Sequence, residues 1–182
     1  MTLFKYAGIK TNDIANAPGI SVSVYLQGCP HHCKGCFNPE TWDFNGGMEF
    51  TEETMNSLIA AMRENSIKRN LCILGGEPLC PQNREHTLYI IKQVLTVYPD
   101  TPIYIWTGYF IEDLFAEEDE TLKNIFDKTY CIVDGPFIEK ERDLTLKMRG
   151  SRNQRIIYMK EVRRKLIEGK ILVFLNKMED FS

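Results

Sequence analysis

Three cysteines, Cys29, Cys33 and Cys36, lie close together directly after an apolar, β-branched run. Their spacing is C-x3-C-x2-C, and Gly28 and Gly35 allow the backbone to curl so that the three sulfurs face one centre. Three thiolates can hold three corners of a four-iron, four-sulfur (4Fe-4S) cluster, whereas a fully protein-ligated cluster takes four cysteines. The spacing therefore predicts a cluster with one iron open to a ligand, as in metal sites that keep a free coordination position.

Zinc is the alternative occupant of this loop. The three cysteines together with either His31 or His32 form a ligand set that zinc accepts, so the loop alone leaves both metals open. The other cysteines are far apart in sequence, which excludes a second cluster. Cys72 and Cys131 lie in apolar runs and are expected to be buried small hydrophobic residues, while Cys80 lies in a loop without an evident ligand partner.

A second motif, Gly75-Gly76-Glu77-Pro78, follows another apolar run. The two glycines would let the backbone approach a ligand closely, and Pro78 fixes the turn. Taken alone the motif also suits a plain type II turn. Its position about forty residues after the cysteine loop, one strand and one helix later, favours a role in the same site.

The elements that must position these motifs alternate along the chain. Apolar strands are expected at 20–27, 70–74, 103–106 and 130–133, with helical periodicity between them at 51–65, 88–98 and, with some interruption, 111–128. This alternation predicts right-handed βαβ units and a parallel sheet. A closed eight-stranded barrel needs about 250 residues, so the expected fold is α/β, a partial, open (β/α) barrel.

Polar residues follow each of the four strands. Ligands of α/β folds bind at the carboxyl ends of strands, so the four segments should meet at one edge of the sheet. Thr107 and Asp134 thereby join the candidate ligand-binding residues. The four segments are Gly28/Cys29, Gly75/Gly76, Thr107/Gly108 and Asp134/Gly135.

Length and composition are consistent with one domain, 1–182, and exclude some partners. The expected parts are a lead-in loop over 1–19, a core over 20–158 and a C-terminal extension over 159–182, with strands or a short helix at 155–159 and 171–175. A net charge of −3 gives no general attraction to nucleic acid or membrane. No apolar stretch is long enough to span a bilayer, and the N-terminus does not read as a signal peptide, so a cytoplasmic location is expected.

The cysteine loop and the Gly-Gly-Glu-Pro turn resemble the signatures of the radical S-adenosylmethionine superfamily. The resemblance implies that the open iron chelates the amino and carboxylate groups of the methionine moiety. It also implies that the amino group contacts the second motif, through the Glu77 carboxylate or carbonyls around Gly76. Many members carry an aromatic residue where this chain has Gly35. The Gly35-Cys36-Phe37 backbone and the Phe37 ring are therefore expected to line the adenine site, with a core phenylalanine as the alternative.

Five ordered motifs between residues 13 and 155 narrow the resemblance to the activating proteins of anaerobic ribonucleoside-triphosphate reductases. This family implies one 4Fe-4S cluster on Cys29, Cys33 and Cys36, S-adenosylmethionine, and an electron donor such as flavodoxin. Its protein substrate is the large reductase subunit, a glycyl-radical protein that loses the Cα hydrogen of one glycine. The motifs are Cys-x3-Cys-x-Gly-Cys-Phe-Asn, Gly-Gly-Glu-Pro-Leu, Trp-Thr-Gly-Tyr, Val-Asp-Gly-Pro-Phe and Arg-Gly-Ser-Arg-Asn-Gln-Arg.

Two other functions stay open from the sequence. One is an activase of another glycyl-radical enzyme, such as pyruvate formate-lyase, although such proteins tend to be longer. The other is a binding module stabilised by zinc. The histidines are not expected to act as catalytic bases, and His86, at the start of a helix, is expected to be solvated. The 149–155 segment has no apolar content and is expected to be a solvated loop or a contact for an anion or a partner.

Overall fold

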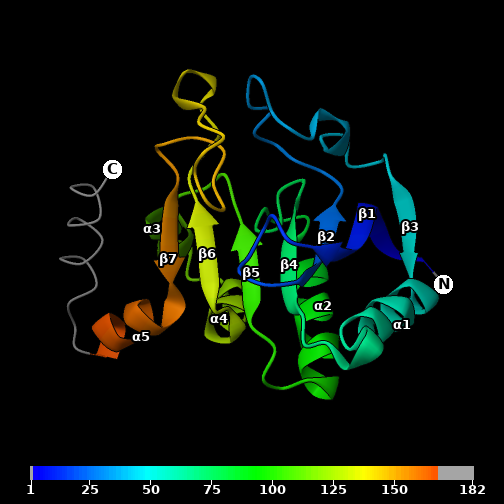
Figure 1. Cartoon of the computed structure of the whole chain (residues 1–182). Helices are drawn as coiled ribbons and strands as arrows, with labels where there is room; N and C mark the ends of the chain where they lie inside the picture. Colours follow the sequence, from blue (N-terminus) through cyan, green and yellow to red (C-terminus); the bar gives the residue numbers. More distant parts are fainter. Residues whose placement is uncertain (1, 168–182) are drawn as a thin grey trace.

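A computed structural model describes residues 2–167, which form a seven-stranded sheet flanked by helices (Figure 1). The strand order is β3-β1-β2-β4-β5-β6-β7. The strands are β1 (Thr2–Asp13), β2 (Ser21–Leu26), β3 (Met48–Thr51), β4 (Asn70–Gly75), β5 (Ile103–Trp106), β6 (Cys131–Asp134) and β7 (Arg155–Tyr158).

The sheet is open and mixed. Its four central strands, β2, β4, β5 and β6, are parallel, as the alternation of strands and helices predicted. The expectation of a parallel sheet is wrong at both edges, because β1 and β3 pair antiparallel on one side and β7 on the other. The segment between β1 and β2 is too short for the crossover helix that a parallel pair requires. Only a 3-10 turn, Glu139–Glu141, lies between β6 and β7.

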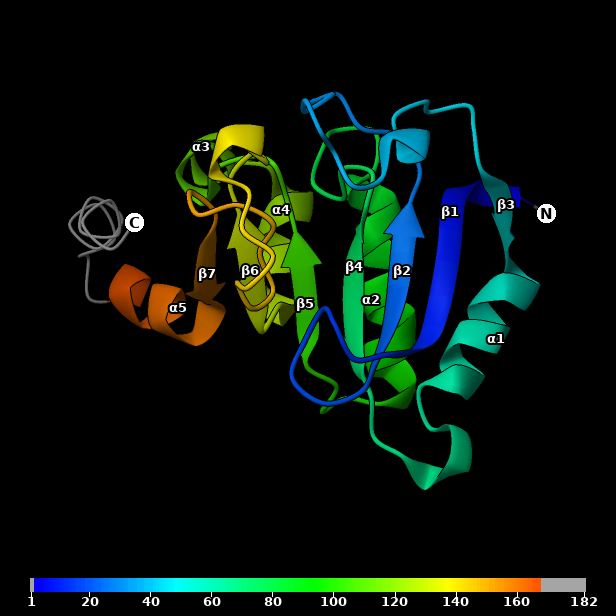
Figure 2. The same ribbon diagram turned by 45° about the horizontal axis from the view of Figure 1, so that its top comes forward.

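Helices α2 and α4 cover one face of the sheet (Figures 1 and 2). Alternate strand residues, such as Leu71 and Ile73 of β4, point into the core between this face and the helices. The opposite face carries a smaller apolar cluster that includes Cys72 and Leu74. The helices are α1 (Glu52–Ala61), α2 (Arg84–Val97), α3 (Ile111–Ala116), α4 (Glu120–Lys128) and α5 (Met159–Ile167).

The assignment of 1–19 to a lead-in loop is wrong for most of that range. Thr2–Asp13 forms the long strand β1, which pairs with both β2 and β3. The Phe4 ring stacks on Phe50 of β3 at 4.3 Å, so burial of aromatic rings fixes this edge of the sheet. Among the described residues of this range, the loop is confined to the turn-forming residues after position 13.

Several other expectations can be compared with the elements. Helix α1 begins at the predicted position, where Thr51 and Thr54 form a reciprocal capping box. A strand at the start of the 155–159 segment is confirmed, while 171–175 lies outside the described residues. His86 is not solvated as expected, since its ring stacks on Phe4 at 4.5 Å and burial lowers its pKa. Within residues 2–167 no helix is long and apolar enough to cross a membrane.

Candidate functional site

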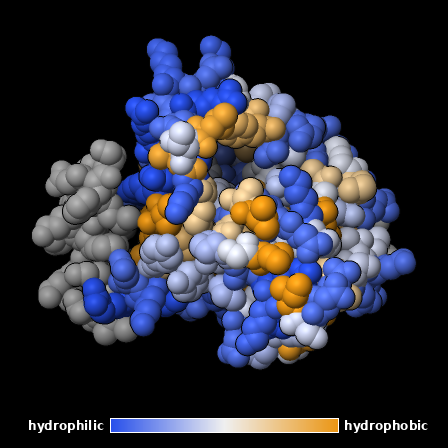
Figure 3. Space-filling model, viewed as in Figure 1, coloured by the Kyte–Doolittle hydropathy of each residue, from blue (hydrophilic) through white to orange (hydrophobic). Residues whose placement is uncertain are grey.

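A cavity of about 570 Å³ lies over the carboxyl ends of the central strands. All three clustered cysteines line it, and so do five of the other predicted ligand-binding residues. The segments that follow β2, β4, β5 and β6 therefore meet at one edge of the sheet, as predicted, with Gly135 in the lining for the segment after β6. Figure 3 shows the surface hollowed near the top of the molecule, beside apolar side chains. The five predicted residues are Phe37, Gly75, Gly76, Glu77 and Thr107.

Backbone hydrogen bonds fix both ends of the cysteine loop. The Gly28 N–H donates to the Thr41 carbonyl at 2.8 Å, and the Cys29 N–H donates to the Trp42 carbonyl at 3.1 Å. Within the loop the Cys36 N–H donates to the Cys33 carbonyl at 3.1 Å. These bonds fix a compact loop between β2 and the 3-10 turn Pro39–Thr41. The three cysteines of this loop line the cavity.

The described residues show no ready-made site for a single metal ion. In the part of the chain from 2 to 167, no three cysteine, histidine or acidic side chains are close enough together to hold one metal ion. Of the two histidines of the zinc alternative, His31 contacts Glu77 through Nε2 at 2.9 Å, while the His32 ring stacks on Trp42 at 4.8 Å. Burial raises the pKa of Cys29 to about 12 and also raises that of Cys33, so metal binding must displace protons here.

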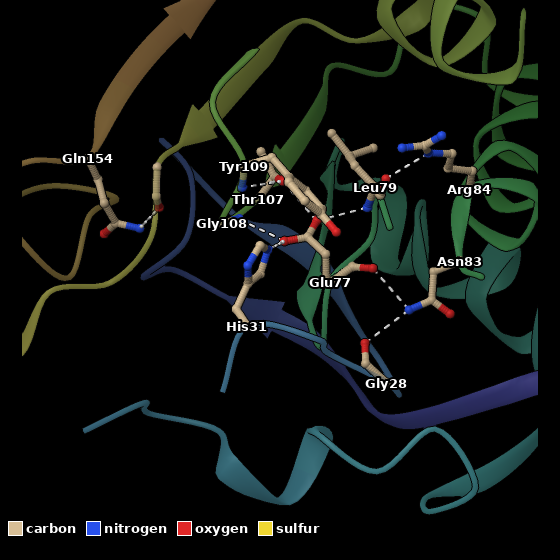
Figure 4. A network of polar contacts seen from close by, with 11 residues as sticks. Gly28, His31, Glu77, Leu79, Asn83, Arg84, Thr107, Gly108, Tyr109 and Gln154 are labelled. Carbon is tan, nitrogen blue, oxygen red and sulfur yellow. Dashed lines mark hydrogen bonds and ion pairs between the residues drawn. The ribbon is translucent and has the colours of Figure 1, made fainter. Parts of the chain in front are cut away.

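The Glu77 carboxylate is the centre of a buried polar network (Figure 4). Its side chain is 1% exposed and accepts four hydrogen bonds. Because two contacts already occupy each carboxylate oxygen, a ligand ammonium would have to use nearby backbone carbonyls instead. The donors are Thr107 Oγ1 at 2.8 Å, the Leu79 N–H at 2.9 Å, the Gly108 N–H at 2.7 Å and His31 Nε2 at 2.9 Å.

The two glycines before Glu77 are needed by the protein's own packing. A Cβ on Gly76 would lie 2.3 Å from the Gly28 carbonyl oxygen. Gly75 has a φ of +99°, and a Cβ there would lie 2.7 Å from Tyr25 Cα. The Glu77 N–H donates to the Gly28 carbonyl at 2.8 Å. The sequence suggested that the two glycines make room for a ligand. The close contact of the turn with the end of the neighbouring strand is sufficient to explain both of them.

Asn83 is a site-supporting residue that sequence reasoning missed. Its side chain is buried, and its Nδ2 donates to the carbonyls of Gln27, Gly28 and Glu77 at 3.0–3.1 Å. These bonds join the start of the cysteine loop to the Gly-Gly-Glu-Pro turn (Figure 4). The only signal in the sequence was a polar residue just before a helix, which also fits an ordinary helix cap.

Gly35 and Asp134 do not line the cavity. Asp134 is fully buried, receives a 2.9 Å hydrogen bond from Arg155 Nε and accepts the Ile111 N–H at 3.0 Å. Arg155 also forms a bidentate ion pair with Glu112. Asp134 therefore holds β7 and the start of α3 together. The sequence did not show this contact, because Arg155 reaches Asp134 only through the pairing of β6 with β7.

Phe37 lies on the cavity wall, and its side chain is 49% exposed. Its ring centroid is 5.1 Å from that of Phe137, and the Arg142 guanidinium lies 5.2 Å from the Phe37 ring. The alternative interpretation of Phe37 as a core residue is wrong, since half of the side chain is accessible. An exposed ring face beside the thiols can stack on a flat ligand group.

The segment between β6 and β7 covers part of the cavity with Leu144, Leu146 and Met148. Trp106 Nε1 donates to the Met148 carbonyl at 2.7 Å. The Gln154 side chain accepts the Gly150 N–H at 2.8 Å and donates to the Gly135 carbonyl, the bond drawn for Gln154 in Figure 4. The segment is therefore an ordered wall rather than a freely solvated loop.

The three arginines of this segment have different roles. Arg155 is internally paired, as described above. Arg152 is 73% exposed and pairs with Asp143 at 3.1 Å, and Arg149 lines the cavity. The expectation of a solvated loop or a contact for an anion or partner thus fails for Arg155, and it stays a prediction for the other two.

Comparison with known proteins gives consistent matches. Residues 15–157 match a family model described as a 4Fe-4S single cluster domain. A protein of Vibrio cholerae is 37% identical over 143 residues, 78% of this chain and 90% of the relative. One of Escherichia coli is 34% identical over 149 residues, covering 81% and 94%. One of bacteriophage T4 is 36% identical over 151 residues, covering 83% and 92%. Each of these relatives is named anaerobic ribonucleoside-triphosphate reductase-activating protein.

Proposed function

The chain belongs to the family of anaerobic ribonucleoside-triphosphate reductase-activating proteins, and from this premise we propose how its residues carry out the activation. It uses one 4Fe-4S cluster and S-adenosylmethionine to generate a glycyl radical on the large reductase subunit. The observation that carries this proposal is the meeting of three cysteine thiols and the Gly-Gly-Glu-Pro turn on the wall of one cavity.

Cys29, Cys33 and Cys36 would hold three irons of the cluster and leave the fourth for the ligand. When bound, the cluster would supply the electron for reductive cleavage of the S-adenosylmethionine sulfonium, which is the chemistry that generates the radical on the reductase. Backbone carbonyls around Gly76 receive the ligand ammonium, because the Glu77 carboxylate is already fully hydrogen-bonded.

The remaining walls orient the ligand and limit water. The accessible Phe37 ring offers a stacking surface for adenine. Leu144, Leu146 and Met148 give the cavity an apolar cover on the side of the β6–β7 segment. A reactive carbon radical needs such a dry, positioned site, since water and stray hydrogen donors compete with the intended glycine.

The open sheet with four parallel central strands supports a partial barrel of the radical S-adenosylmethionine type. An electron donor such as flavodoxin and a cytoplasmic location are further parts of the proposal. The names of the relatives favour the reductase as protein substrate over pyruvate formate-lyase.

Metal analysis after anaerobic reconstitution tests the proposal. About four irons per chain are expected for the wild type. Cys33→Ala should lose the cluster and the reductive cleavage of S-adenosylmethionine, whereas Cys72→Ala, a buried cysteine of the sheet, should retain both. A glycyl signal in electron paramagnetic resonance should form only when the reduced protein, S-adenosylmethionine and the reductase are combined. Zinc alone in the purified protein, or cleavage that persists in Cys33→Ala, would contradict the assignment.

A further inference from the structure

The charged groups on the cavity wall are mostly cationic. The lining includes Lys10, Arg149 and Glu77, together with His31. Glu77 accepts four hydrogen bonds from the protein, so its charge is already compensated by fixed donors. Lys10 is exposed and lies 5.2 Å from the centre of the Tyr25 ring. A ligand entering this cavity therefore meets cations and no free carboxylate among the described residues.

Arg149 differs from the two arginines that follow it. Arg152 and Arg155 each pair with a carboxylate, whereas Arg149 has no ion pair anywhere in residues 2–167. Its Nη1 donates to the Gln154 carbonyl at 3.0 Å, while its Nε is buried without a hydrogen-bond partner. A buried guanidinium donor without an acceptor is costly, so an acceptor placed at the Arg149 Nε would stabilise this side chain.

The protein holds Arg149 in place from both sides. Before it, the Met148 carbonyl accepts the Trp106 indole N–H, and Met148 has a φ of +63°, an uncommon conformation for a non-glycine residue. After it, the Gly150 N–H donates to Gln154 Oε1, and a Cβ on Gly150 would lie 2.7 Å from the Phe37 ring. The backbone that carries Arg149 thus packs directly beside the residue that follows Cys36.

We propose that Arg149 binds the carboxylate of the methionine moiety of S-adenosylmethionine, an inference that rests on the proposed function. A planar guanidinium matches a carboxylate through paired N–H donors. The carboxylate is the only anionic group of this ligand, whose other charges are an ammonium and a sulfonium. Arg149 therefore selects the amino-acid end of the ligand and holds it on the wall nearest the cysteine loop.

The test compares two ligands on the reconstituted, iron-loaded protein by anaerobic calorimetry. S-adenosylmethionine carries the carboxylate, and decarboxylated S-adenosylmethionine lacks it while keeping the ammonium and the sulfonium. Arg149→Gln should weaken binding of S-adenosylmethionine on the order of 10- to 100-fold and leave binding of the decarboxylated ligand unchanged. Arg149→Lys keeps the positive charge but loses the paired N–H donors of the guanidinium. It should give a smaller loss of affinity, confined to S-adenosylmethionine. It also serves as the test if the Gln variant does not fold.

Arg152→Gln is the matched control, because this neighbouring arginine is exposed and outside the cavity lining. It should bind both ligands like the wild type. The inference is overturned if the Arg149 variants bind both ligands as the wild type does, or lose affinity for both in parallel. It is also overturned if Lys10→Met, rather than an Arg149 variant, removes the preference for the carboxylate. A wild-type protein with its cluster that binds neither ligand would overturn the proposed function as well.

Discussion

Glu77 shows why the role of a motif residue depends on its contacts. The sequence offered its carboxylate as a partner for a ligand ammonium, yet the carboxylate is buried and accepts bonds from three separate segments. His31 of the cysteine loop supplies one of these bonds, and Thr107 and Gly108 supply two more. The carboxylate thus links the cysteine loop to the ends of β4 and β5.

His31→Leu should destabilise the protein because it removes one of the four donors to a buried carboxylate. The expected loss in the free energy of unfolding is about 1–3 kcal/mol, measured by urea unfolding of the metal-free protein under anaerobic conditions. His31→Gln keeps a side-chain N–H at similar reach and should recover most of the loss. A leucine variant as stable as the wild type would show that this hydrogen bond contributes little.

At the scale of residues, the sequence predicted the site residues whose side-chain type alone indicates a chemical role. Cys29, Cys33 and Cys36 were predicted to share one site because clustered thiols have few other uses, and all three line the cavity. Asn83 and the pairing of Asp134 with Arg155 were missed, because each acts through a contact with a segment far along the chain. A polar residue at a strand end looks the same in sequence whether it faces a ligand or a buried arginine.

At the scale of elements, the turn after β4 packs so closely against the start of the cysteine loop that Gly76 has no room for a side chain. Gly76→Ala should lower the free energy of unfolding by about 1–3 kcal/mol, because the new Cβ would lie 2.3 Å from a backbone oxygen that cannot rotate away. Gly8→Ala in β1 is the control, since a Cβ there has no heavy atom within 4 Å. Thermal unfolding of both variants decides the matter, and equal midpoints would refute the packing argument.

The segment between β6 and β7 depends on Asp143. Its carboxylate accepts the Thr145 hydroxyl at 2.6 Å and the Thr145 N–H at 3.0 Å, and it pairs with Arg152. These contacts, the Thr145 hydroxyl bond foremost, lower the pKa of Asp143 to about 2. Because the folded pKa is below the ordinary value of 3.8, the stabilisation is complete above about pH 4 and disappears as the pH falls toward 2.

Asp143→Asn should therefore unfold at a lower temperature than the wild type near pH 6. The difference between the two midpoints should shrink between pH 4 and pH 2, where the wild-type carboxylate becomes protonated. Thermal unfolding at several pH values in this range gives the comparison. A difference that stays constant down to pH 2 would show that the charge of Asp143 is not what stabilises the segment.

Strands in the centre of the sheet were predictable and those at its edge were not. β4 and β5 are buried apolar runs followed by polar turns, a pattern that few other structures produce. β1 was obscured by the turn-forming residues after Asp13, and β3 is only four residues long, Met48–Thr51. Both are fixed by their pairing with each other and by the stacked rings of Phe4 and Phe50, which are 46 positions apart in the chain.

At the scale of the whole molecule, the cavity is built from both halves of the chain. The parallel strands place the cysteine loop and the Gly-Gly-Glu-Pro turn together, and the sequence predicted this convergence. The segment between β6 and β7 adds a further wall, with three apolar side chains and Arg149. Sequence reasoning left this segment open because it lacks the periodicity of a helix or a strand.

Under the proposed function the reductase reaches this cavity from outside, and Arg152 lies at the surface of the β6–β7 segment with 73% of its side chain exposed. If the reductase contacts this position, Arg152→Glu should weaken the affinity of the complex roughly tenfold at low salt. The effect should be smaller at high salt, because salt screens exposed charges. Iron content and S-adenosylmethionine binding should stay at wild-type values. Lys123→Glu makes the same change of charge on α4, the helix that covers the other face of the sheet, and should leave the affinity unchanged. Surface plasmon resonance with the reductase at two salt concentrations measures both variants, and equal affinities for Arg152→Glu and the wild type would place the partner contact elsewhere.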